Sequence, residues 1–352
     1  MKNLTVNLIS ESVYLPKGHG VHTAFLNTVE MLKEKKVQVL VNSRQKADIT
    51  HIHTVGPFAW YKLISSKNTV VSAHVIPGSF EGSLVLTSYW LGSAKQYLRY
   101  FYNKADLVLA VAPKVKEELV KMGVASPIEV FPNPIDLKTF KKDEVARKAV
   151  RERYGFIEED FVVLDVGQVQ TRKGIGDFLL AAEKLPGIKF VWIGGKPFGK
   201  LTKIEKELEE KIASPPKNVL FAGQHKVEEM PDLYNLADCF FFPSYQENAP
   251  MSVIEAACVG LPLVLRDLSE YRLLYKEGYI AGGEENFAEN IKRLKEDKNF
   301  YSNWSKLAIS LAKKFNFDSL GDKLIQYYIS LEKQSSRFIE DDYISLRNKR
   351  EM

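Results

Sequence analysis

Short apolar runs alternate with amphipathic segments twice along this chain of 352 residues, and this alternation constrains the fold more than any other feature. The first half predicts a helix over residues 21–35 and strands at 4–9, 37–41, 49–53, 69–73, 107–111 and 128–131. The second half predicts strands at 161–166, 190–193, 219–221, 239–242 and 263–265, with helices between them. Strands that alternate with helices favour parallel sheets covered on both faces. The sequence therefore predicts an α/β protein with two doubly wound, Rossmann-like halves that face each other across a ligand-binding cleft.

The stretch between the two halves breaks the pattern. Pro132 and Pro134 end the first set of strands, and a charged segment follows them. We therefore expect a first domain at 1–137, a linker at 138–158 and a second domain at 159–316. Residues 317–334 are expected to be helical. The charged tail 335–352 is expected to be either disordered or a membrane contact.

The composition excludes several classes of protein. Hydrophobic residues make up 45% and charged residues 26%, which is ordinary for a globular chain. Cys239 and Cys258 are too few for a disulfide framework and lack the spacing of a zinc site. The first residues lack the apolar core of a signal peptide, and no apolar run approaches the ~18 residues of a spanning helix. We expect a cytoplasmic protein.

The net charge of +5 is too small to indicate a nucleic-acid partner. The charge is unevenly distributed, because the first 150 residues hold 20 Lys and Arg against 12 Asp and Glu. We therefore expect the first half to face an anionic partner.

A glycine-containing loop precedes the first predicted helix. Gly18 and Gly20 would let a phosphate approach backbone N–H groups at the helix start. The third glycine of a dinucleotide fingerprint is missing, and the next strand ends in polar residues without an acid. Arg44 leaves an NADP site as an alternative, and a tight turn without any ligand is another.

Two glutamates eight positions apart, Glu247 and Glu255, lie on either side of a predicted strand-to-helix junction. Carboxylates accept hydrogen bonds from hydroxyl groups, while the intervening N–H groups and the helix dipole favour an anion. A nucleotide-sugar has this layout of two polyol parts beside a charged group. The alternative is an acidic loop followed by a solvated helix glutamate.

A basic loop follows the first strand of the second half. Arg172 and Lys173 stand between Gly167 and Gly174, just before a predicted helix. Two cations at this place can neutralise a diphosphate. A solvated basic turn is the alternative.

Taken together, these motifs resemble the retaining glycosyltransferases of family 4, which are two-domain enzymes of the GT-B fold. The family's E-x7-E motif is matched by Glu247 and Glu255. The other matching pieces, in the family's order, are the N-terminal glycine loop, Ala73-His74, Asn133-Pro-Ile-Asp136, Arg172-Lys173-Gly174 and Ala237-Asp238. Residues 161–266 look most like bacterial enzymes that add hexoses to diacylglycerol or glucosyl-diacylglycerol. In this fold the C-terminal helix usually crosses back to the first domain.

The resemblance implies a UDP-hexose donor and a role for each motif. Lys173, with or without help from Arg172, would stabilise the β-phosphate. Glu247 would orient the sugar, and Glu255 would bind the ribose. His74 would contact the sugar from the first domain. Further donor contacts are expected from Gly18, Gly20, Gly167, Gln168, Gly194, Gln224, Asn248, Ala249, Met251 and Ser252. Retention would follow if the acceptor attacks from the face of the leaving group.

No D-x-D sequence occurs in the chain, so we expect metal-independent activity with no cofactor. Two positions depart from the family's pattern. Gln168 stands where an arginine is common, and Pro250 stands where a glycine is usual. Either Arg172 compensates for the charge that Gln168 lacks or phosphate binding is weaker than usual in the family, and Pro250 has no N–H to offer the ligand.

The segment 83–104 is basic and aromatic, with no acidic residue. As a helix it would carry one stripe with Trp90, Tyr97 and Phe101 and another with Lys95, Arg99 and Tyr102, followed by Lys104. This composition is typical of a helix in the headgroup region of an anionic membrane. We expect peripheral association with the inner face of the cell membrane. A core-packed helix with a solvated basic edge is the alternative.

The sequence leaves other functions open. The same architecture serves nucleotide-sugar epimerases, NADP oxidoreductases and non-catalytic sugar-nucleotide-binding proteins, and a family member can act on a polysaccharide or another soluble acceptor. His51 and His53 alternate along a predicted strand, and we expect them to have a structural role.

Overall fold

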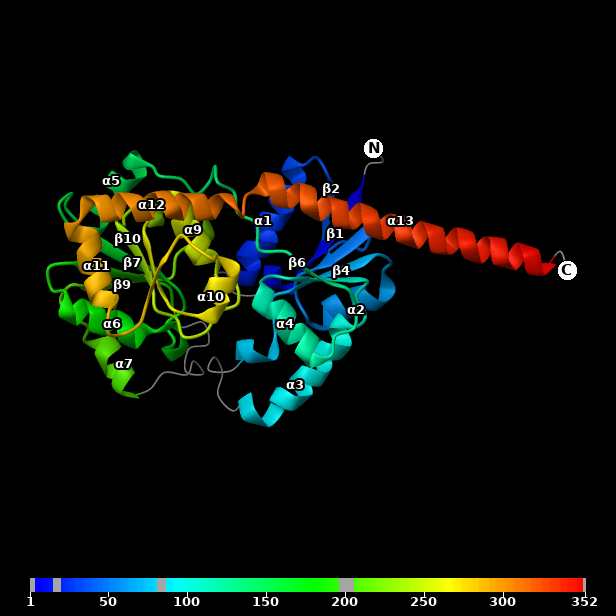
Figure 1. The fold of residues 1–352 in the computed structure, drawn as a ribbon, viewed down its shortest axis with the longest axis horizontal. Helices are drawn as coiled ribbons and strands as arrows, with labels where there is room; N and C mark the ends of the chain where they lie inside the picture. Colours follow the sequence, from blue (N-terminus) through cyan, green and yellow to red (C-terminus); the bar gives the residue numbers. More distant parts are fainter. Residues whose placement is uncertain (1–3, 15–19, 81–86, 196–205, 351–352) are drawn as a thin grey trace.

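The structure is a computed structural model that describes residues 4–14, 20–80, 87–195 and 206–350 (Figure 1). Side chains at 79–80, 87–91, 206–207 and 335–350 lie outside the described part. The fold consists of two parallel six-stranded sheets with helices on their faces, as the sequence predicts.

The first sheet has the order β2-β1-β3-β4-β5-β6. Its strands are β1 (Thr5–Ile9), β2 (Gln38–Val41), β3 (Ile49–Ile52), β4 (Thr69–Ala73), β5 (Leu107–Ala110) and β6 (Ile128–Val130). All five strand pairs are parallel. Its helices are α1 (Gly20–Glu34), α2 (Pro57–Ser65), α3 (Thr87–Tyr102) and α4 (Pro113–Met122), with short 3-10 helices η1 (Glu11–Tyr14) and η2 (Pro77–Phe80).

The second sheet has the order β12-β11-β10-β7-β8-β9 and is also parallel. Its strands are β7 (Val162–Val166), β8 (Lys189–Ile193), β9 (Val219–Gly223), β10 (Cys239–Phe242), β11 (Leu263–Arg266) and β12 (Ile280–Gly282). The short strand β12 was not predicted. The helices of this half are α5 (Glu144–Tyr154), α6 (Ile175–Lys184), α7 (Lys206–Ala213), α8 (Met230–Tyr234), α9 (Met251–Val259), α10 (Ser269–Leu274), α11 (Phe287–Glu296) and α12 (Lys298–Lys313), with 3-10 turns η3 (Thr171–Lys173) and η5 (Val227–Glu229).

Helix α5 occupies the segment that we expected to be a linker. Asp143 caps its first turn, because the carboxylate accepts hydrogen bonds from the N–H groups of Val145 and Ala146. Gly155 ends the helix in the left-handed conformation, at φ 74°. Arg147 then donates to Asp238 at 2.7 Å, so α5 is held against the second sheet.

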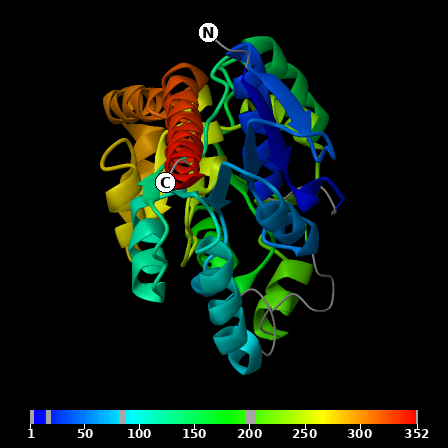
Figure 2. The same ribbon diagram turned by 90° about the vertical axis from the view of Figure 1, so that its right-hand side faces the viewer.

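The C-terminal helix α13 (Phe317–Arg350) is a single helix of 34 residues. It passes from the second half across the first, and its end projects beyond the body of the protein (Figure 1). Figure 2 looks along it nearly end-on. The segment expected as a separate charged tail therefore continues the crossover helix up to Arg350. Among the helices of the described ranges, none is long and apolar enough to cross a membrane.

One hydrophobic core joins the two halves. A single cluster of buried side chains contains residues of both sheets, of α9 and α12, and of α13. Two further clusters of buried side chains cover the other faces of the sheets, one on the first sheet and one on the second. In α13, Tyr328 is fully buried, and its hydroxyl lies 2.6 Å from Nδ1 of His51. The other ring nitrogen of His51 lies 2.8 Å from Oγ of Ser72, so His51 has the structural role that we expected.

The bond between Tyr328 and His51 can be tested by Tyr328→Phe. The variant leaves a buried ring nitrogen without its partner, so we expect the free energy of unfolding to fall by about 1–3 kcal/mol. Urea denaturation measures the change. The neighbouring Tyr327 is only half-buried, and Tyr327→Phe is the matched control, with an expected loss below about 1 kcal/mol. Equal losses in the two variants would contradict a specific role for the buried bond.

Candidate active site

The basic loop and the first glutamate meet at the carboxyl edge of the second sheet. Lys173 ends η3, which follows β7, and Glu247 lies in the loop between β10 and α9. Because β7 and β10 are parallel neighbours, the loops after them emerge side by side. The fold therefore brings together two motifs that lie 74 residues apart in the sequence.

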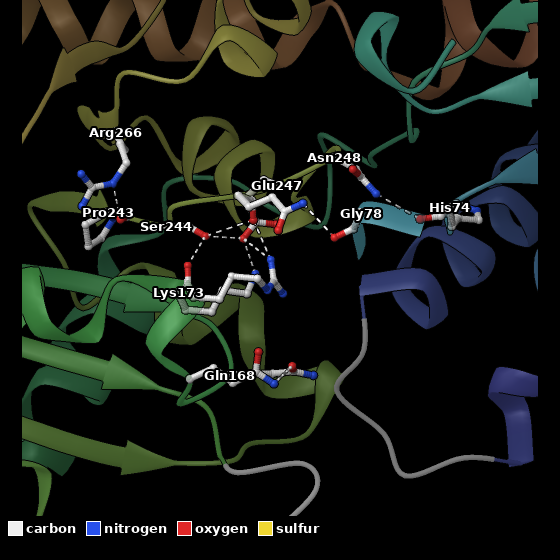
Figure 3. A network of polar contacts seen from close by, with 12 residues as sticks. His74, Gly78, Gln168, Lys173, Pro243, Ser244, Glu247, Asn248 and Arg266 are labelled. Atoms are coloured by element: carbon white, nitrogen blue, oxygen red, sulfur yellow. Dashed lines mark hydrogen bonds and ion pairs between the residues drawn. The ribbon is translucent and has the colours of Figure 1, made fainter. Parts of the chain in front are cut away.

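Glu247 and Lys173 form a buried ion pair. Nζ of Lys173 lies 2.5 Å from Oε1 of Glu247, and the two side chains are 13% and 9% exposed. The hydroxyl of Ser244 donates to the same carboxylate oxygen at 2.7 Å. Arg172 lies 3.7 Å from that oxygen and donates to the carbonyl of Gln246 at 2.6 Å. Figure 3 shows Lys173 and Ser244 beside Glu247.

The pKa values of this pair follow from burial and attraction. Burial alone would raise the pKa of Glu247, but Lys173 and Arg172 outweigh it and hold that pKa below its ordinary value. Burial lowers the pKa of Lys173, and the attraction of Glu247 opposes this effect. We therefore take Glu247 as ionised at neutral pH, with Lys173 as its cationic partner.

The loop that carries Glu247 also bridges to the first half of the chain. The amide of Gln246 donates to the carbonyl of Gly78 at 2.8 Å, and the amide of Asn248 donates to the carbonyl of His74 at 3.3 Å (Figure 3). Asn133 donates back to the carbonyl of Ala249 at 3.3 Å. These three bonds tie Glu247 to both sides of the cleft.

A cavity of about 470 Å³ lies beside Glu247, between the two halves. Its wall from the first half comes from η2, α3 and α4, and its wall from the second half comes from the Glu247 loop and α10. The lining residues are Ile76, Pro77, Gly78, Gly92, Lys95, Lys114, Glu118, Lys121, Met122, Gln246, Glu247, Asn248 and Glu270.

His74 lies near the cleft, but its ring faces another histidine. Nε2 of His74 lies 3.1 Å from Nδ1 of His53, and the two rings stack. Burial lowers the pKa of His74 to about 4, so the ring is neutral at pH 7. The other ring nitrogen of His53 is buried and has no hydrogen-bond partner among the described residues. The expected contact of His74 with a sugar stays a prediction.

Glu255 is buried rather than solvated. It is the fifth residue of α9, is 7% exposed, and accepts a hydrogen bond from the hydroxyl of Tyr234 at 2.6 Å. Burial raises the pKa of Glu255 to about 7. The alternative of a solvated helix glutamate is therefore wrong. Tyr234 could not be found by motif, because it comes from a different helix, α8.

Gly167, after β7, and Gly194, after β8, are two expected donor positions whose backbones approach closely. Gly194 has φ +142°, and a Cβ atom there would lie 1.9 Å from the carbonyl oxygen of Gly167. The indole of Trp192 donates to this same oxygen at 2.9 Å. Gln168 accepts a hydrogen bond from Gln170 at 3.0 Å. Gln224 lies close to the backbone of Gly195, next to Gly194.

Four other residues were expected to contact the donor. Met251 and Ser252 begin α9, and Met251 is buried. Gly20 begins α1 in open surroundings. Gly18 lies outside the described residues.

The expected membrane helix is partly wrong. Phe101 is fully buried in the core of the first half and so is Tyr102, so neither can contact a membrane. Phe101 packs inward, against Trp60 of α2 and the apolar residues of the first sheet. Lys95, Arg99 and Lys104 are exposed. Tyr97 is 40% exposed, and its hydroxyl group donates to the carbonyl of Val55. The side chain of Trp90 lies outside the described part.

Two buried charged groups near the site were not predicted. Arg266 forms an ion pair with Asp177, donates to the carbonyl of Pro243 at 2.9 Å, and lies 3.9 Å from the ring centre of Tyr245. Asp165, on β7, is fully buried, and neither of its oxygens has a hydrogen-bond partner in the described part of the chain. Burial raises the pKa of Asp165 well above its ordinary value, and the nearby Lys173 opposes this shift.

The ion cluster at the site therefore has a net positive charge. Arg172 and Lys173 bring two positive charges, and Glu247 brings one negative charge. The cluster keeps one positive charge in a nearly dry environment, which suits an anion such as a diphosphate. Within the described ranges, no group of three or more His, Cys, Asp or Glu side chains is arranged to hold a metal ion.

Comparisons with known proteins agree with this arrangement. The family model of group 1 glycosyl transferases matches residues 146–310, and that of glycosyltransferase family 4 matches residues 14–139. The alpha-galactosylglucosyldiacylglycerol synthase of Streptococcus pneumoniae is 33% identical over 347 residues, covering 95% of this chain and 91% of that protein. The processive diacylglycerol alpha-glucosyltransferase of Acholeplasma laidlawii is 27% identical, covering 81% of this chain and 85% of that protein.

Solved structures show the same fold at low sequence identity. Anabaena HepE in complex with UDP-glucose has a TM-score of 0.72 and 17% identity, covering 93% of this chain and 100% of that chain. Sucrose-phosphate synthase from Thermosynechococcus elongatus has a TM-score of 0.76 and 17% identity, covering 93% and 99%. The expected GT-B fold is confirmed.

The buried pair can be tested by a double-mutant cycle on Lys173→Ala and Glu247→Ala. Removing one partner leaves a buried charge, so each single change is expected to lower the free energy of unfolding by about 3–5 kcal/mol. The double variant should lose less than the sum of the two. Urea denaturation measures all three. The exposed pair Lys33–Glu30, at 2.8 Å, is the control, with an expected coupling below about 1 kcal/mol. Additive losses at Lys173 and Glu247 would contradict the pairing.

Glu255 predicts a pH dependence of stability. Its pKa in the folded protein, about 7, lies above the ordinary value of 4.5, so the folded state binds more protons between these two pH values. The contribution of Glu255 to stability therefore falls as the pH rises from 4.5 to 7, by about 3 kcal/mol. Unfolding of the wild type and of Glu255→Gln should be compared from about pH 4 to pH 8. We expect the variant to gain in relative stability over this range, and a constant difference would contradict the burial effect.

Proposed function

The chain belongs to the glycosyltransferases of group 1 and family 4, and we propose that it transfers a hexose from UDP-glucose or UDP-galactose to a membrane glycolipid, with retention at the anomeric carbon. The acceptor would be diacylglycerol or glucosyl-diacylglycerol. The observation that carries the donor half of this proposal is the cationic cluster of Lys173 and Arg172 around Glu247.

The acceptor half is supported by similarity. A relative that matches 95% of this chain is an alpha-galactosylglucosyldiacylglycerol synthase, and a second relative is a diacylglycerol alpha-glucosyltransferase. The UDP donor is supported by the fold shared with HepE, which was solved with UDP-glucose. The geometry at Glu247 agrees with both the proposed donor and the proposed acceptor. The net positive charge of Lys173, Arg172 and Glu247 suits a diphosphate, and the cavity beside them has room for an acceptor.

In the proposed mechanism, Lys173 and Arg172 bind the diphosphate of the donor. Negative charge grows on the β-phosphate as the leaving group departs, and a cation fixed in a nearly dry site stabilises it without reorganisation. Gln168 adds no charge.

The two glutamates would hold the polyol parts of the donor. Glu247 is ionised and faces the cavity, so it can accept hydrogen bonds from sugar hydroxyls near the anomeric carbon. Glu255 would serve the ribose, with Tyr234 orienting its carboxyl group. Closure of the cleft completes the site, because Gln246 and Asn248 tie the Glu247 loop to the first half.

Retention would follow from attack on the face of the leaving group. The acceptor oxygen bonds to the anomeric carbon as the bond between that carbon and the β-phosphate oxygen breaks. The proton of the acceptor hydroxyl passes to the departing phosphate, so no separate side-chain base is needed. The reaction needs no metal in this scheme, since Lys173 and Arg172 supply the positive charge.

We further propose peripheral association with the inner face of the cell membrane through the exposed basic edge of α3. Arg99 and Lys104 are exposed there, Lys95 is exposed where α3 borders the cavity, and Tyr97 and Tyr100 are partly exposed beside them. Cationic and aromatic side chains of this kind favour the headgroup region of an anionic bilayer.

A transfer assay tests the function. Purified protein, radiolabelled UDP-glucose or UDP-galactose, and vesicles with diacylglycerol or glucosyl-diacylglycerol should give a labelled lipid in the presence of a chelator. Lys173→Ala is expected to lower kcat by about 10²-fold or more, because it removes the stabiliser of the leaving group. Lys33→Ala, at an exposed lysine far from the site, is the control and should leave kcat unchanged.

Each half of the proposal has its own contrary outcome in this assay. Activity that disappears in chelator and returns with magnesium or manganese would contradict metal independence. Labelling of a soluble glycan added to the assay, with no lipid labelled, would contradict the membrane acceptor while leaving the donor site intact.

A further inference from the structure

Two histidines lie side by side at the carboxyl edge of the first sheet. His53 directly follows β3, and His74 directly follows β4. The two strands are parallel neighbours, with Ile52 opposite Val71, so the residues that follow them meet at one edge of the sheet. This edge borders the cleft, because the carbonyl of His74 accepts a hydrogen bond from Asn248 of the second half (Figure 3).

The rings of these two histidines share a hydrogen bond. Nδ1 of His53 lies 3.1 Å from Nε2 of His74, and the ring centres are 5.3 Å apart. Burial lowers the pKa of His53 well below its ordinary value and that of His74 to about 4, so both rings are neutral at pH 7. A neutral imidazole has one N–H donor and one acceptor nitrogen. One of the two facing nitrogens therefore carries a proton, and the other accepts it.

The surroundings of His53 decide which ring donates. Nε2 of His53 is buried and has no hydrogen-bond partner among the described residues. The neighbouring rings are those of Phe25, which has no acceptor atom, and His51, whose nitrogens are both engaged elsewhere. A buried N–H group without an acceptor is costly. The proton of His53 is therefore favoured on Nδ1, and His74 accepts it at Nε2.

This arrangement fixes the state of His74. Because Nε2 of His74 accepts from His53, the proton of its neutral ring lies on Nδ1. Nδ1 is also the nitrogen that remains for a ligand. A donor held in place before the ligand arrives needs no reorganisation during the reaction.

The two histidines differ in their access to the cleft. His53 is 2% exposed, whereas His74 is half-buried. A ligand in the cleft can therefore reach His74 but not His53. Any effect of His53 on the reaction has to pass through the ring of His74.

We propose that His53 is a positioning residue that keeps the proton of His74 on Nδ1, so that His74 donates a hydrogen bond to a hydroxyl oxygen of the transferred hexose. The inference rests on the proposed function and on the expected contact of His74 with the sugar. It adds a residue that no substrate touches.

The matched variants His53→Asn and His53→Leu test this role. The two new side chains have nearly the same size and shape, and both remove the imidazole ring. Only the amide of Asn offers an N–H donor near the place of Nδ1. A difference between the two variants therefore reports the hydrogen bond rather than the lost ring, and urea denaturation checks that both variants fold.

NMR of the ring nitrogens measures the protonation state of His74 without any substrate. The chain has six histidines, and the signals of His74 are those that disappear in His74→Ala. We expect the wild type and His53→Asn to carry the proton of His74 on Nδ1. We expect His53→Leu to show a mixture of the two neutral forms. The same state of His74 in the wild type and in His53→Leu would overturn the inference.

The transfer assay measures the consequence for the reaction. We expect kcat of His53→Leu to be about 5-fold or more below that of His53→Asn, because a hydrogen bond that orients His74 is lost. Combined with His74→Ala, the two variants should agree in kcat within about twofold, since the residue through which they act is gone. UDP affinity by calorimetry should stay within about twofold in both, because the sugar and not UDP is the expected partner of His74.

Equal kcat values of His53→Asn and His53→Leu would overturn the inference. A difference that persists in the His74→Ala background would do so too, because it would show that His53 acts through packing. These outcomes differ from the failure of the proposed function, in which the wild type binds UDP but labels no lipid. The NMR measurement then still supports or overturns the effect of His53 on His74.

Discussion

The ion pair between Lys173 and Glu247 is the interaction on which the rest of the site depends. A carboxylate that is 9% exposed is stable only with a close cation and further donors, and Lys173, Ser244 and Arg172 supply them. The pair joins the loops that follow β7 and β10, so the parallel order of the second sheet is what makes it possible. Burying these charges costs free energy, and the close pairing of Lys173 with Glu247 offsets that cost.

The loop that carries Glu247 also links the candidate site to the arrangement of the two halves. Gln246 and Asn248 bond to backbone groups of the first half on either side of Glu247. On the far side, α13 returns to the first half and buries Tyr328 against His51. The two halves are thus joined by a hydrophobic core and a crossover helix, while the polar contacts at the cleft are few and direct. The position of Glu247 therefore depends on how the two halves meet.

The alternation of apolar runs was sufficient to predict both parallel sheets, because strand and helix periods are local properties of the sequence. It also placed Glu247 and Lys173 at strand ends, where loops of neighbouring strands converge. Contacts between distant elements were not predictable in this way. The bond of Tyr234 to Glu255, the stacking of His74 on His53 and the burial of Asp165 depend on side chains brought together by tertiary packing. Composition suggested a membrane stripe with Phe101, but only packing could show that this residue faces the core.

The most direct test of the account is a crystal structure of the protein with UDP and a hexose donor analogue. The account predicts that Nζ of Lys173 contacts the β-phosphate, with Arg172 beside it, while Glu247 faces the sugar and the ribose lies toward Glu255. A diphosphate bound away from Lys173, with the pair between Lys173 and Glu247 unchanged and closed to the ligand, would contradict the central claim.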